Sequence, residues 1–311
     1  MRKQRIIRPR SPSKTPKWFT EADAALMNSG LARTTVRAYR AAATLLIGWL
    51  EHIDQTIETL QPADILAYRQ HLTNVEGRKA ATINLRLQAI RWLCGWAHHQ
   101  GYLKTNPASE VSTIRVATRR RPSGLSEAEV HRLLRAAGQS RPSQRTRNYA
   151  ILQFLLQAGL RVSEVSHLRI GDVTLHDRSG HVCVREGKGA KEREVPLNIS
   201  VRRSIRAYLA DRVNAKPHGP LFLSQKGRAI SERSIEALVA QLARQAKLDH
   251  RVTPHTFRHA FALNFLRDNP GKLVELASLM GHESLDTTAI YTQPSSEELA
   301  ADLEKSRFNV F

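Results

Sequence analysis

The chain has 311 residues, 41% of them hydrophobic, so it is long enough for two packed domains and wholesale disorder is excluded. Its formal net charge of +20 at pH 7 favours a polyanionic partner such as DNA or RNA. Charge alone also fits a protein kept soluble by its charge, or one associated with the ribosome. Cys94 and Cys183 are far apart and lack a C-x-x-C pattern, which argues against a disulfide framework or zinc site and fits a reducing cytoplasm. No apolar stretch predicts a signal peptide or a membrane span, so no membrane partner is expected.

The first part of the chain is predicted to be a basic arm followed by a helical domain. Residues 1–17 carry many arginines and lysines with no acidic residue, which is typical of a flexible arm. Over residues 18–108, apolar residues recur at three- and four-residue steps, most clearly at 34–50, from Pro62 onward and at 80–99. This periodicity predicts a compact bundle of four or five helices.

Several polar and basic residues stand at the predicted helix starts and on polar helix faces of this bundle. They are expected to contact DNA phosphates, although every surface helix also needs a solvated polar face. The candidates are Arg33, Thr35, Arg78, Lys79 and Arg86.

Residues 109–123 are predicted to link two domains. Asn106-Pro107 ends the bundle, and the following stretch has few large apolar residues. Its consecutive arginines, Arg119, Arg120 and Arg121, are expected to follow a phosphate backbone.

The second domain, residues 124–296, is predicted to be mostly helical with one small antiparallel β-sheet. Ser126 is a suitable N-cap for a first helix, and residues 148–158 read as a buried helix that Gly159 ends. Residues 181–185 and 193–197 alternate as the strands of a hairpin, with Gly187-Lys188-Gly189 in the turn. Residues 297–311 form a tail that stays apolar to its end.

Three local patterns in this domain suggest phosphate chemistry, although each is weak alone. Arg161 and Glu164 lie three residues apart, so the carboxylate can hold a guanidinium fork suited to two phosphate oxygens. Lys188, between two glycines, is exposed at the predicted hairpin tip, but the motif is not a P-loop. His255 and Arg258 follow Thr253-Pro254 at a helix start, where an anion is favoured.

The remaining patterns concern histidines and a late tyrosine. His255 and His259 have the four-residue spacing of some zinc ligands, but Thr256 stands where a metalloprotease has its glutamate, so no metal site is predicted. Gly281 ends a helix, His282 follows it, and Tyr291 comes nine residues later. Alone, such a tyrosine is usually a packing residue.

Taken together and in this order, the motifs closely resemble those of the tyrosine recombinases, the integrase family that includes phage integrases, Cre and the bacterial Xer proteins. The resemblance is strongest in residues 158–173, 187–197, 253–266 and 279–293. It implies six catalytic residues, with Glu164 in support: Arg161, Lys188, His255, Arg258, His282 and Tyr291. His282 stands where some members have tryptophan.

The resemblance implies transesterification without a metal or other cofactor. Tyr291 would attack the scissile phosphate to give a 3′-phosphotyrosyl link, while Arg161 and Arg258 stabilise the transition state. Lys188 would protonate the leaving 5′-oxygen and His255 would accept the tyrosine proton, whereas His282 would contact a phosphate oxygen. Two rounds would exchange strands through a Holliday junction.

The same resemblance implies an assembly around DNA. Two domains would form a C-shaped clamp on double-stranded DNA with an inverted-repeat core site, as a homotetramer or as a dimer on one site. Accessory DNA-bending proteins are possible partners, and the C-terminal tail would dock on a neighbouring protomer or in cis. Two alternatives stay open: a type IB topoisomerase, and a non-catalytic DNA-binding protein on a recombinase scaffold. The sequence leaves integration, excision and resolution undistinguished.

Overall fold

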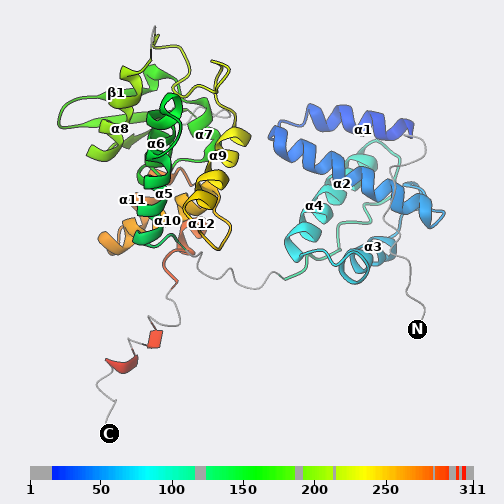
Figure 1. The fold of residues 1–311 in the computed structure, drawn as a ribbon. Helices are drawn as coiled ribbons and strands as arrows, with labels where there is room; N and C mark the ends of the chain where they lie inside the picture. Colours follow the sequence, from blue (N-terminus) through cyan, green and yellow to red (C-terminus); the bar gives the residue numbers. More distant parts are fainter. Residues whose placement is uncertain are drawn as a thin grey trace. The chain divides into compact units, whose positions relative to one another are not determined.

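The chain divides into two compact units, Met1–Thr118 and Arg119–Phe311, in the computed structural model (Figure 1). The structure describes residues 16–115, 124–185, 192–212, 215–282, 284–293, 299–300 and 303–305. Most of the predicted basic arm, the second half of the predicted linker and most of the tail therefore lie outside the described residues. Each unit has its own hydrophobic core.

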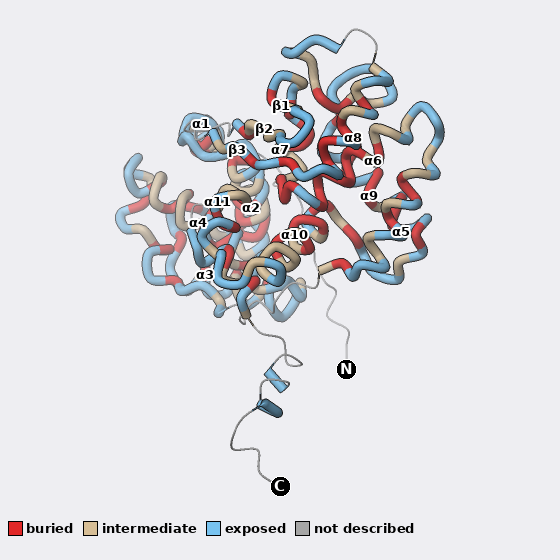
Figure 2. Tube along the Cα trace, turned by 90° about the vertical axis from the view of Figure 1, so that its left-hand side faces the viewer, coloured by how far each residue is buried: buried red, intermediate tan, exposed pale blue. Residues whose placement is uncertain are grey.

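The N-terminal unit is a helical bundle, as predicted. Its helices are α1 (Lys17–Met27), α2 (Arg33–His52), α3 (Pro62–Asn74) and α4 (Ala80–His99). Apolar residues at helical spacing turn to the inside, so the buried positions lie where the helices meet (Figure 2). Helix α3 begins as the sequence predicts, with Pro62 in its first turn and a reciprocal cap between Gln61 and Asp64.

The chain after α4 still packs on this unit. Ala108 and Val111 belong to its core, and the side chain of Asn84 exchanges hydrogen bonds of 2.9 and 2.8 Å with the backbone of Ile114. Residues 109–115, expected to be the start of a linker, are thus part of the packed unit as far as the structure describes them. Arg119, Arg120 and Arg121 lie outside the described residues.

The C-terminal unit is mainly helical around a buried central helix. Its elements are α5 (Glu127–Gly138), α6 (Pro142–Gln157), α7 (Val162–His167), η1 (Ile170–Asp172), β1 (Val173–Leu175), β2 (Gly180–Arg185), β3 (Glu192–Pro196), α8 (Ile199–Ala210), α9 (Glu232–Gln245), α10 (Pro254–Asp268), α11 (Leu273–Met280) and α12 (Asp286–Ala289). The second half of α6 is buried nearly all round, because α5, α8 and α10 pack against this helix. Gly159, with φ +61°, follows its end.

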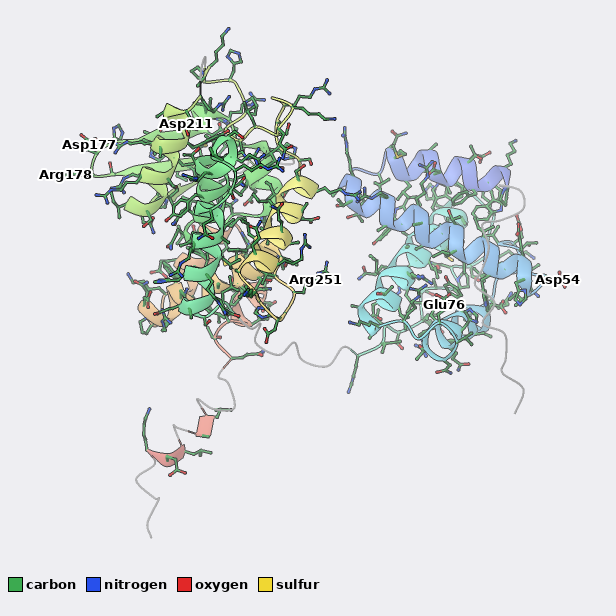
Figure 3. The ribbon with its side chains drawn as sticks, in the orientation of Figure 1. Asp54, Glu76, Asp177, Arg178, Asp211 and Arg251 are labelled. Atoms are coloured by element: carbon green, nitrogen blue, oxygen red, sulfur yellow. The ribbon has the colours of Figure 1, made fainter. Side chains whose placement is uncertain are left out.

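The sheet is antiparallel, with strand order β1-β2-β3. The predicted hairpin is confirmed in its strands: Val182 pairs with Val195 and Cys183 with Glu194. Its tip, including Lys188, lies outside the described residues. Strand β1 was not predicted, and Asp177 and Arg178 lie in its connection to β2 at the margin of the unit (Figure 3).

Helix caps place the later elements as expected. Ser126 caps α5 through Glu129, and Thr253 accepts a hydrogen bond from the backbone of Thr256 at the start of α10. Gly281 ends α11 in the left-handed conformation, with φ +64°. The predicted fold class, mainly helical with a small antiparallel sheet in two domains, is confirmed. None of the helices in the described ranges is both long and apolar enough to cross a bilayer.

Candidate active site

Three of the six predicted catalytic residues line one small cavity in the C-terminal unit. Arg161 follows α6 and caps α7, whereas His255 and Arg258 lie in the first turns of α10. Together with Thr253 and Pro254 they surround a cavity of about 250 Å³. Arg161 is far from α10 in the sequence but lies next to it in space, because α10 packs against α6, the helix that precedes Arg161.

Among the described residues, Glu164 and Gly281 hold the side chain of Arg161 in one pose. Its Nη1 donates to Oε1 of Glu164 at 2.9 Å, and its Nη2 donates to the backbone oxygen of Gly281 at 2.7 Å. Its backbone N–H also donates to Oε2 of Glu164 at 2.6 Å. This geometry fits a supporting role for Glu164, because one carboxylate oxygen binds the guanidinium of Arg161 and the other binds its backbone N–H.

A second arginine, Arg193 of β3, completes this group. Its Nη2 donates to Oε2 of Glu164 at 2.9 Å, and its Nε donates to the backbone oxygen of Leu279 at 3.0 Å. Burial would raise the pKa of the Glu164 carboxyl, but the hydrogen bonds and charges of Arg193 and Arg161 outweigh burial and lower it. Glu164 is therefore ionised between two cations at neutral pH.

Arg258 is buried, with 3% of its surface exposed, and all its partners are acceptors. Its Nη1 donates to the backbone oxygen of Gly159, and its Nη2 donates to the oxygen of Met280 at 2.7 Å. Nη2 also contacts Nε2 of His282 at 2.9 Å. Burial and then the charge of Arg161 lower the pKa of Arg258 to about 10, so it remains a cation at neutral pH.

The contacts of His282 show which of its two ring nitrogens carries the hydrogen. An arginine only donates, so Nε2 of His282 accepts from Arg258. Nδ1 then carries the hydrogen and donates to Oγ1 of Thr288 at 2.7 Å. Burial and the charge of Arg258 lower the pKa of His282 to about 4, so the ring is neutral at pH 7. In this arrangement His282 positions Arg258.

Tyr291 is buried, with 4% of its surface exposed, at the end of the segment that follows α12. Its ring packs with Ala262, Leu276 and Met280. Its hydroxyl lies 2.7 Å from Nδ1 of His259, on α10. Burial raises the pKa of Tyr291 although Arg258 opposes this, so the resting side chain is a neutral phenol.

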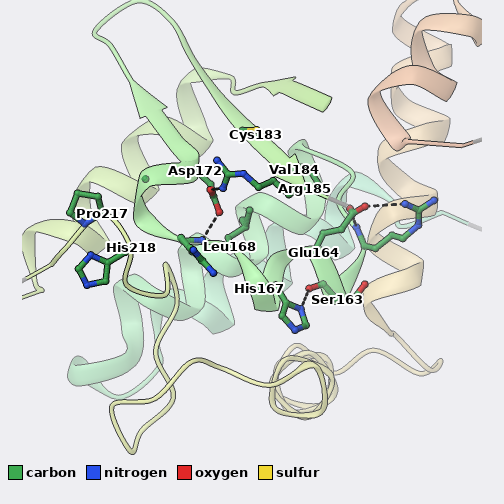
Figure 4. A pocket seen from close by; sticks show the side chains of 13 residues that line it. Ser163, Glu164, His167, Leu168, Asp172, Cys183, Val184, Arg185, Pro217 and His218 are labelled. Atoms are coloured by element: carbon green, nitrogen blue, oxygen red, sulfur yellow. Dashed lines mark hydrogen bonds and ion pairs between the residues drawn. The ribbon is translucent and has the colours of Figure 1, made fainter. Parts of the chain in front are cut away.

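A larger groove begins at Arg161 and runs between α7 and the sheet. Its volume is about 920 Å³, and its lining includes Glu164, His167, Arg169 and His218. Arg185 crosses its wall and is directed at Asp172 (Figure 4). Beyond Arg161 its lining includes Arg169 and Arg185, so the groove offers cationic side chains to an anion that reaches the cavity.

The structure thus joins most, but not all, of the predicted site. Arg161 with Glu164, and Arg258 with His282, form two hydrogen-bonded pairs, and both arginines also donate to the backbone at the end of α11. Tyr291 contacts α10 through His259. His255 is exposed, and its ring centroid lies 4.9 Å from that of His259. Lys188 lies outside the described residues, so its predicted role stays a prediction.

Two residues of the site were missed by sequence reasoning. Arg193 sits in a strand with alternating charges, Glu192-Arg193-Glu194, whose inner face is set only by its pairing with β2. His259 was considered only as a metal ligand paired with His255. The available signal was that His259 directly follows Arg258 and lies with His255 and Arg258 in the first turns of α10.

The candidate DNA contacts of the N-terminal unit differ in exposure. Arg33, Arg78 and Lys79 are exposed, and Thr35 is partly exposed. Arg86 does not lie on an exposed face as expected: it is 8% exposed and hydrogen-bonds Tyr68 and Glu76, each at 3.5 Å. Burial next to Glu76 gives Arg86 a structural contact that periodicity alone could not predict.

Comparison with known families shows to which protein family the chain belongs. Residues 123–298 match the phage integrase family, and residues 23–101 match the phage integrase N-terminal SAM-like domain. The chain belongs to the phage integrase family. Its predicted resemblance to the tyrosine recombinases is thereby confirmed.

Curated relatives match nearly the whole chain. It is 31% identical over 295 residues to the tyrosine recombinase XerD of Ralstonia nicotianae, covering 94% of both chains. It is 33% identical over 283 residues to the tyrosine recombinase XerD of Yersinia pestis, covering 89% of this chain and 92% of the relative.

Solved structures share the fold. The XerH recombinase bound to its difH substrate in a pre-cleavage complex has a TM-score of 0.71 at 20% identity, and the match covers 92% of this chain and 83% of XerH. A lambda integrase dimer bound to a COC′ core site has a TM-score of 0.68 at 18% identity, covering 89% and 76%.

Proposed function

We propose that the protein is a site-specific DNA recombinase that breaks and rejoins strands through a phosphotyrosine at Tyr291. The observation that carries this proposal is the cavity lined by Arg161, His255 and Arg258, in the same unit as a buried tyrosine whose hydroxyl reaches α10. The tyrosine recombinase relatives and the phage integrase family support the same reaction.

The arginines supply electrostatic stabilisation. A scissile phosphate in the cavity would meet two guanidinium groups whose other donors are fixed by Glu164, Gly159 and Met280. Such preorganised donors stabilise the charge that develops on a pentavalent phosphorus, an effect worth about 10²–10³-fold in rate for one donor. Arg161 and Arg258 thus bring two positive charges to the cavity that a phosphate would occupy.

The remaining roles follow the predicted chemistry. Tyr291 attacks phosphorus, the bond to the 5′-oxygen breaks, and the DNA 3′-phosphate stays on the tyrosine. Lys188 gives a proton to the leaving oxygen. His255 lies beside the phosphate, at the exposed side of the cavity. His282 accepts from Arg258 through Nε2. On protonation, which the added phosphate charge would favour, this nitrogen would release Arg258 and could donate to a phosphate oxygen.

DNA binding uses both units in this proposal. The groove that starts at Arg161 accepts the strand next to the scissile phosphate, and Arg33 and Lys79 contact phosphates from the N-terminal unit. Both units bind the inverted-repeat core site, and the protein acts as a tetramer that exchanges strands through a Holliday junction. The reaction takes place in the cytoplasm, and accessory DNA-bending proteins are further partners.

The two alternative functions have different signatures. A type IB topoisomerase would relax supercoiled DNA as a monomer without a defined site. A non-catalytic DNA-binding protein on a recombinase scaffold would bind DNA without cleaving it. The recombinase relatives favour neither. The intact set of Arg161, Glu164, Arg258 and His282 is the arrangement that a catalytic site requires, whereas a binding protein has no need of it.

The test begins with the DNA site, which can be selected from randomised duplexes with the Tyr291→Phe protein. The selected site is then nicked near the cleavage point, so that the short 5′-hydroxyl fragment leaves and a covalent adduct is trapped. Wild type and Tyr291→Phe are compared on denaturing gels, with EDTA present.

A covalent adduct that forms with wild type and disappears with Tyr291→Phe is the expected result. The two proteins should bind the site with the same affinity, because the hydroxyl makes no phosphate contact before attack. Tight binding by wild type without any adduct would overturn the enzymatic function and support the non-catalytic DNA-binding protein. Site-independent relaxation of supercoiled plasmid would support the topoisomerase.

A further inference from the structure

The hydroxyl of Tyr291 touches a histidine that the predicted mechanism does not use. Nδ1 of His259 lies 2.7 Å from the Tyr291 oxygen, and the two rings are tilted by 55° with centroids 5.5 Å apart. Tyr291 is 4% exposed and its ring is packed against Ala262 and Met280. The hydroxyl is therefore held in one place by its ring packing and by this hydrogen bond.

The direction of this hydrogen bond follows from the charge state of both groups. Burial, and then the charges of His255 and Arg258, lower the pKa of His259 to about 4, so its ring is neutral at pH 7. Burial raises the pKa of Tyr291, with Arg258 opposing, so Tyr291 keeps its proton. A phenol is a better donor than acceptor because its oxygen lone pair is shared with the ring, and a neutral imidazole nitrogen is a good acceptor.

His255 and His259 are neighbours on one face of α10, four residues apart, but they meet different groups. His255 is exposed and lines the cavity with Arg161 and Arg258, whereas His259 is partly buried beside Tyr291. Their ring centroids are 4.9 Å apart and the planes are nearly perpendicular, at 75°. His255 thus faces the place of the phosphate, and His259 faces the nucleophile.

We propose that His259 is the residue that positions the nucleophile and accepts its proton, while His255 serves the phosphate. The proposal rests on the phosphotyrosine mechanism above. As the Tyr291 oxygen bonds to phosphorus, its O–H bond breaks and an N–H bond forms at Nδ1 of His259. The phosphorus bond to the 5′-oxygen breaks, and that oxygen takes a proton from the general acid. The extra proton on His259 returns when the 5′-hydroxyl reverses the reaction.

The experiment compares His259→Asn with His259→Leu. The amide oxygen of asparagine can occupy the place of Nδ1 as an acceptor, whereas leucine keeps bulk and removes the acceptor. Single-turnover formation of the covalent adduct is measured on the nicked substrate, together with DNA affinity and the free energy of unfolding. Each variant is also tested on DNA with a 5′-bridging sulfur, whose leaving group needs no proton.

We expect both variants to slow cleavage by about 100-fold, with DNA affinity unchanged, because an amide oxygen can hold the hydroxyl but cannot take its proton. His259→Asn should be the less impaired of the two, since it keeps an acceptor that positions the Tyr291 oxygen. The loss should be equal on the oxygen and the sulfur substrates, because it arises on the nucleophile side. Rescue by sulfur would place His259 on the leaving-group side and overturn the proposal. Cleavage by either folded variant at the wild-type rate would overturn it too.

A measurement without cleavage separates this proposal from the proposed function. In protein labelled with ¹⁵N-histidine, the His259 ring resonances are assigned by their loss in His259→Asn, and Tyr291→Phe should shift the Nδ1 signal. If wild type forms no adduct but this shift is present, the recombinase function fails and the hydrogen bond stands. If Tyr291→Phe leaves the Nδ1 signal unchanged, the contact itself fails, whatever the protein does to DNA.

Discussion

Glu164 on α7 accepts a hydrogen bond of 2.9 Å from Arg193 on β3 and so joins the sheet to the helix that Arg161 caps. The same carboxylate binds Arg161, and Arg193 in turn binds the backbone of Leu279 in α11. One buried carboxylate therefore connects three elements of the site. Arg161 keeps its orientation because Glu164 keeps its charge.

Replacing Glu164 with glutamine should destabilise the protein by about 3 kcal/mol, because two arginines would lose an ionised partner in a buried place. Adduct formation should fall as well, since Arg161 would no longer be held. Chemical unfolding and single-turnover cleavage measure the two effects. Glu127→Gln is the matched control: its pair with Arg267 spans 3.9 Å, and the Glu127 side chain is 84% exposed. We expect that control to change stability by less than about 1 kcal/mol. Equal effects of the two substitutions would contradict the role of Glu164.

Stability should fall as the pH drops below about 6.5, because two histidines are neutral only in the folded state. The pKa values of His259 and His282 are about 4 in the fold, below the ordinary value of about 6.5. Between these values the unfolded chain binds protons that the fold excludes, so the free energy of unfolding rises with pH there and levels off above about 6.5. After discounting for partial exposure, the loss should be on the order of 1–2 kcal/mol per histidine.

Urea unfolding near pH 7 and near pH 5 tests this, with His282→Asn as the variant. That variant should lose less stability than wild type over the same interval, because one of the two protonation sites is gone. Glu164 acts in the same direction but at lower pH, since its pKa is also lowered. His218→Asn, at an exposed position of the same unit, is the control and should keep the wild-type pH dependence. An unchanged slope in His282→Asn would refute the assignment.

Gly281 should tolerate no side chain, for two separate reasons. Its φ of +64° is strained for an L-residue, and a Cβ there would lie 2.7 Å from Nη1 of Arg193. Gly227 has a similar φ of +71°, but a Cβ there would meet nothing within 4 Å. Gly227→Ala therefore measures backbone strain alone, about 1–2 kcal/mol.

Gly281→Ala should cost clearly more than Gly227→Ala, because it also displaces Arg193 from Glu164. It should lower the rate of adduct formation, whereas Gly227→Ala should leave that rate unchanged. Thermal or urea unfolding and the nicked-substrate assay provide both comparisons. If the two alanine variants were equally stable and equally active, the close approach of Arg193 to Gly281 would have no energetic weight.

Much of the site was predictable because its signals are local. Thr253 and Pro254 mark the start of α10, and Gly281 marks the end of α11, so His255, Arg258 and His282 could be placed near helix ends from sequence alone. The ion pair of Arg161 with Glu164 follows from helical spacing. Each of these features depends on residues within one turn.

What could not be predicted depends on contacts between distant segments. Arg193 reaches Glu164 only after β3 has paired with β2, and strand β1 has three residues, too few for a periodic pattern. Arg86 is buried because Glu76, from the end of another helix, offers it a carboxylate. The hydrogen bond of His259 to Tyr291 needs α10 and the segment after α12 to pack together.

The N-terminal unit should contribute phosphate contacts that salt weakens. Arg33 and Lys79 are exposed at the starts of α2 and α4, so each is free to neutralise a phosphate and release a counterion. Arg33→Gln and Lys79→Gln should each reduce the slope of log Kobs against log salt by about 0.9. Fluorescence anisotropy over a series of salt concentrations, on the selected site, measures the slope.

Arg86→Gln is the informative comparison for these two variants. Arg86 has the same charge but is buried against Tyr68 and Glu76, so its replacement should lower the stability of the N-terminal unit by about 2 kcal/mol. Under conditions where the unit stays folded, the salt slope should match that of wild type. A reduced slope in Arg86→Gln with unchanged stability would restore Arg86 as a phosphate contact. A full wild-type slope in Arg33→Gln and Lys79→Gln would remove the two helix starts from the DNA interface.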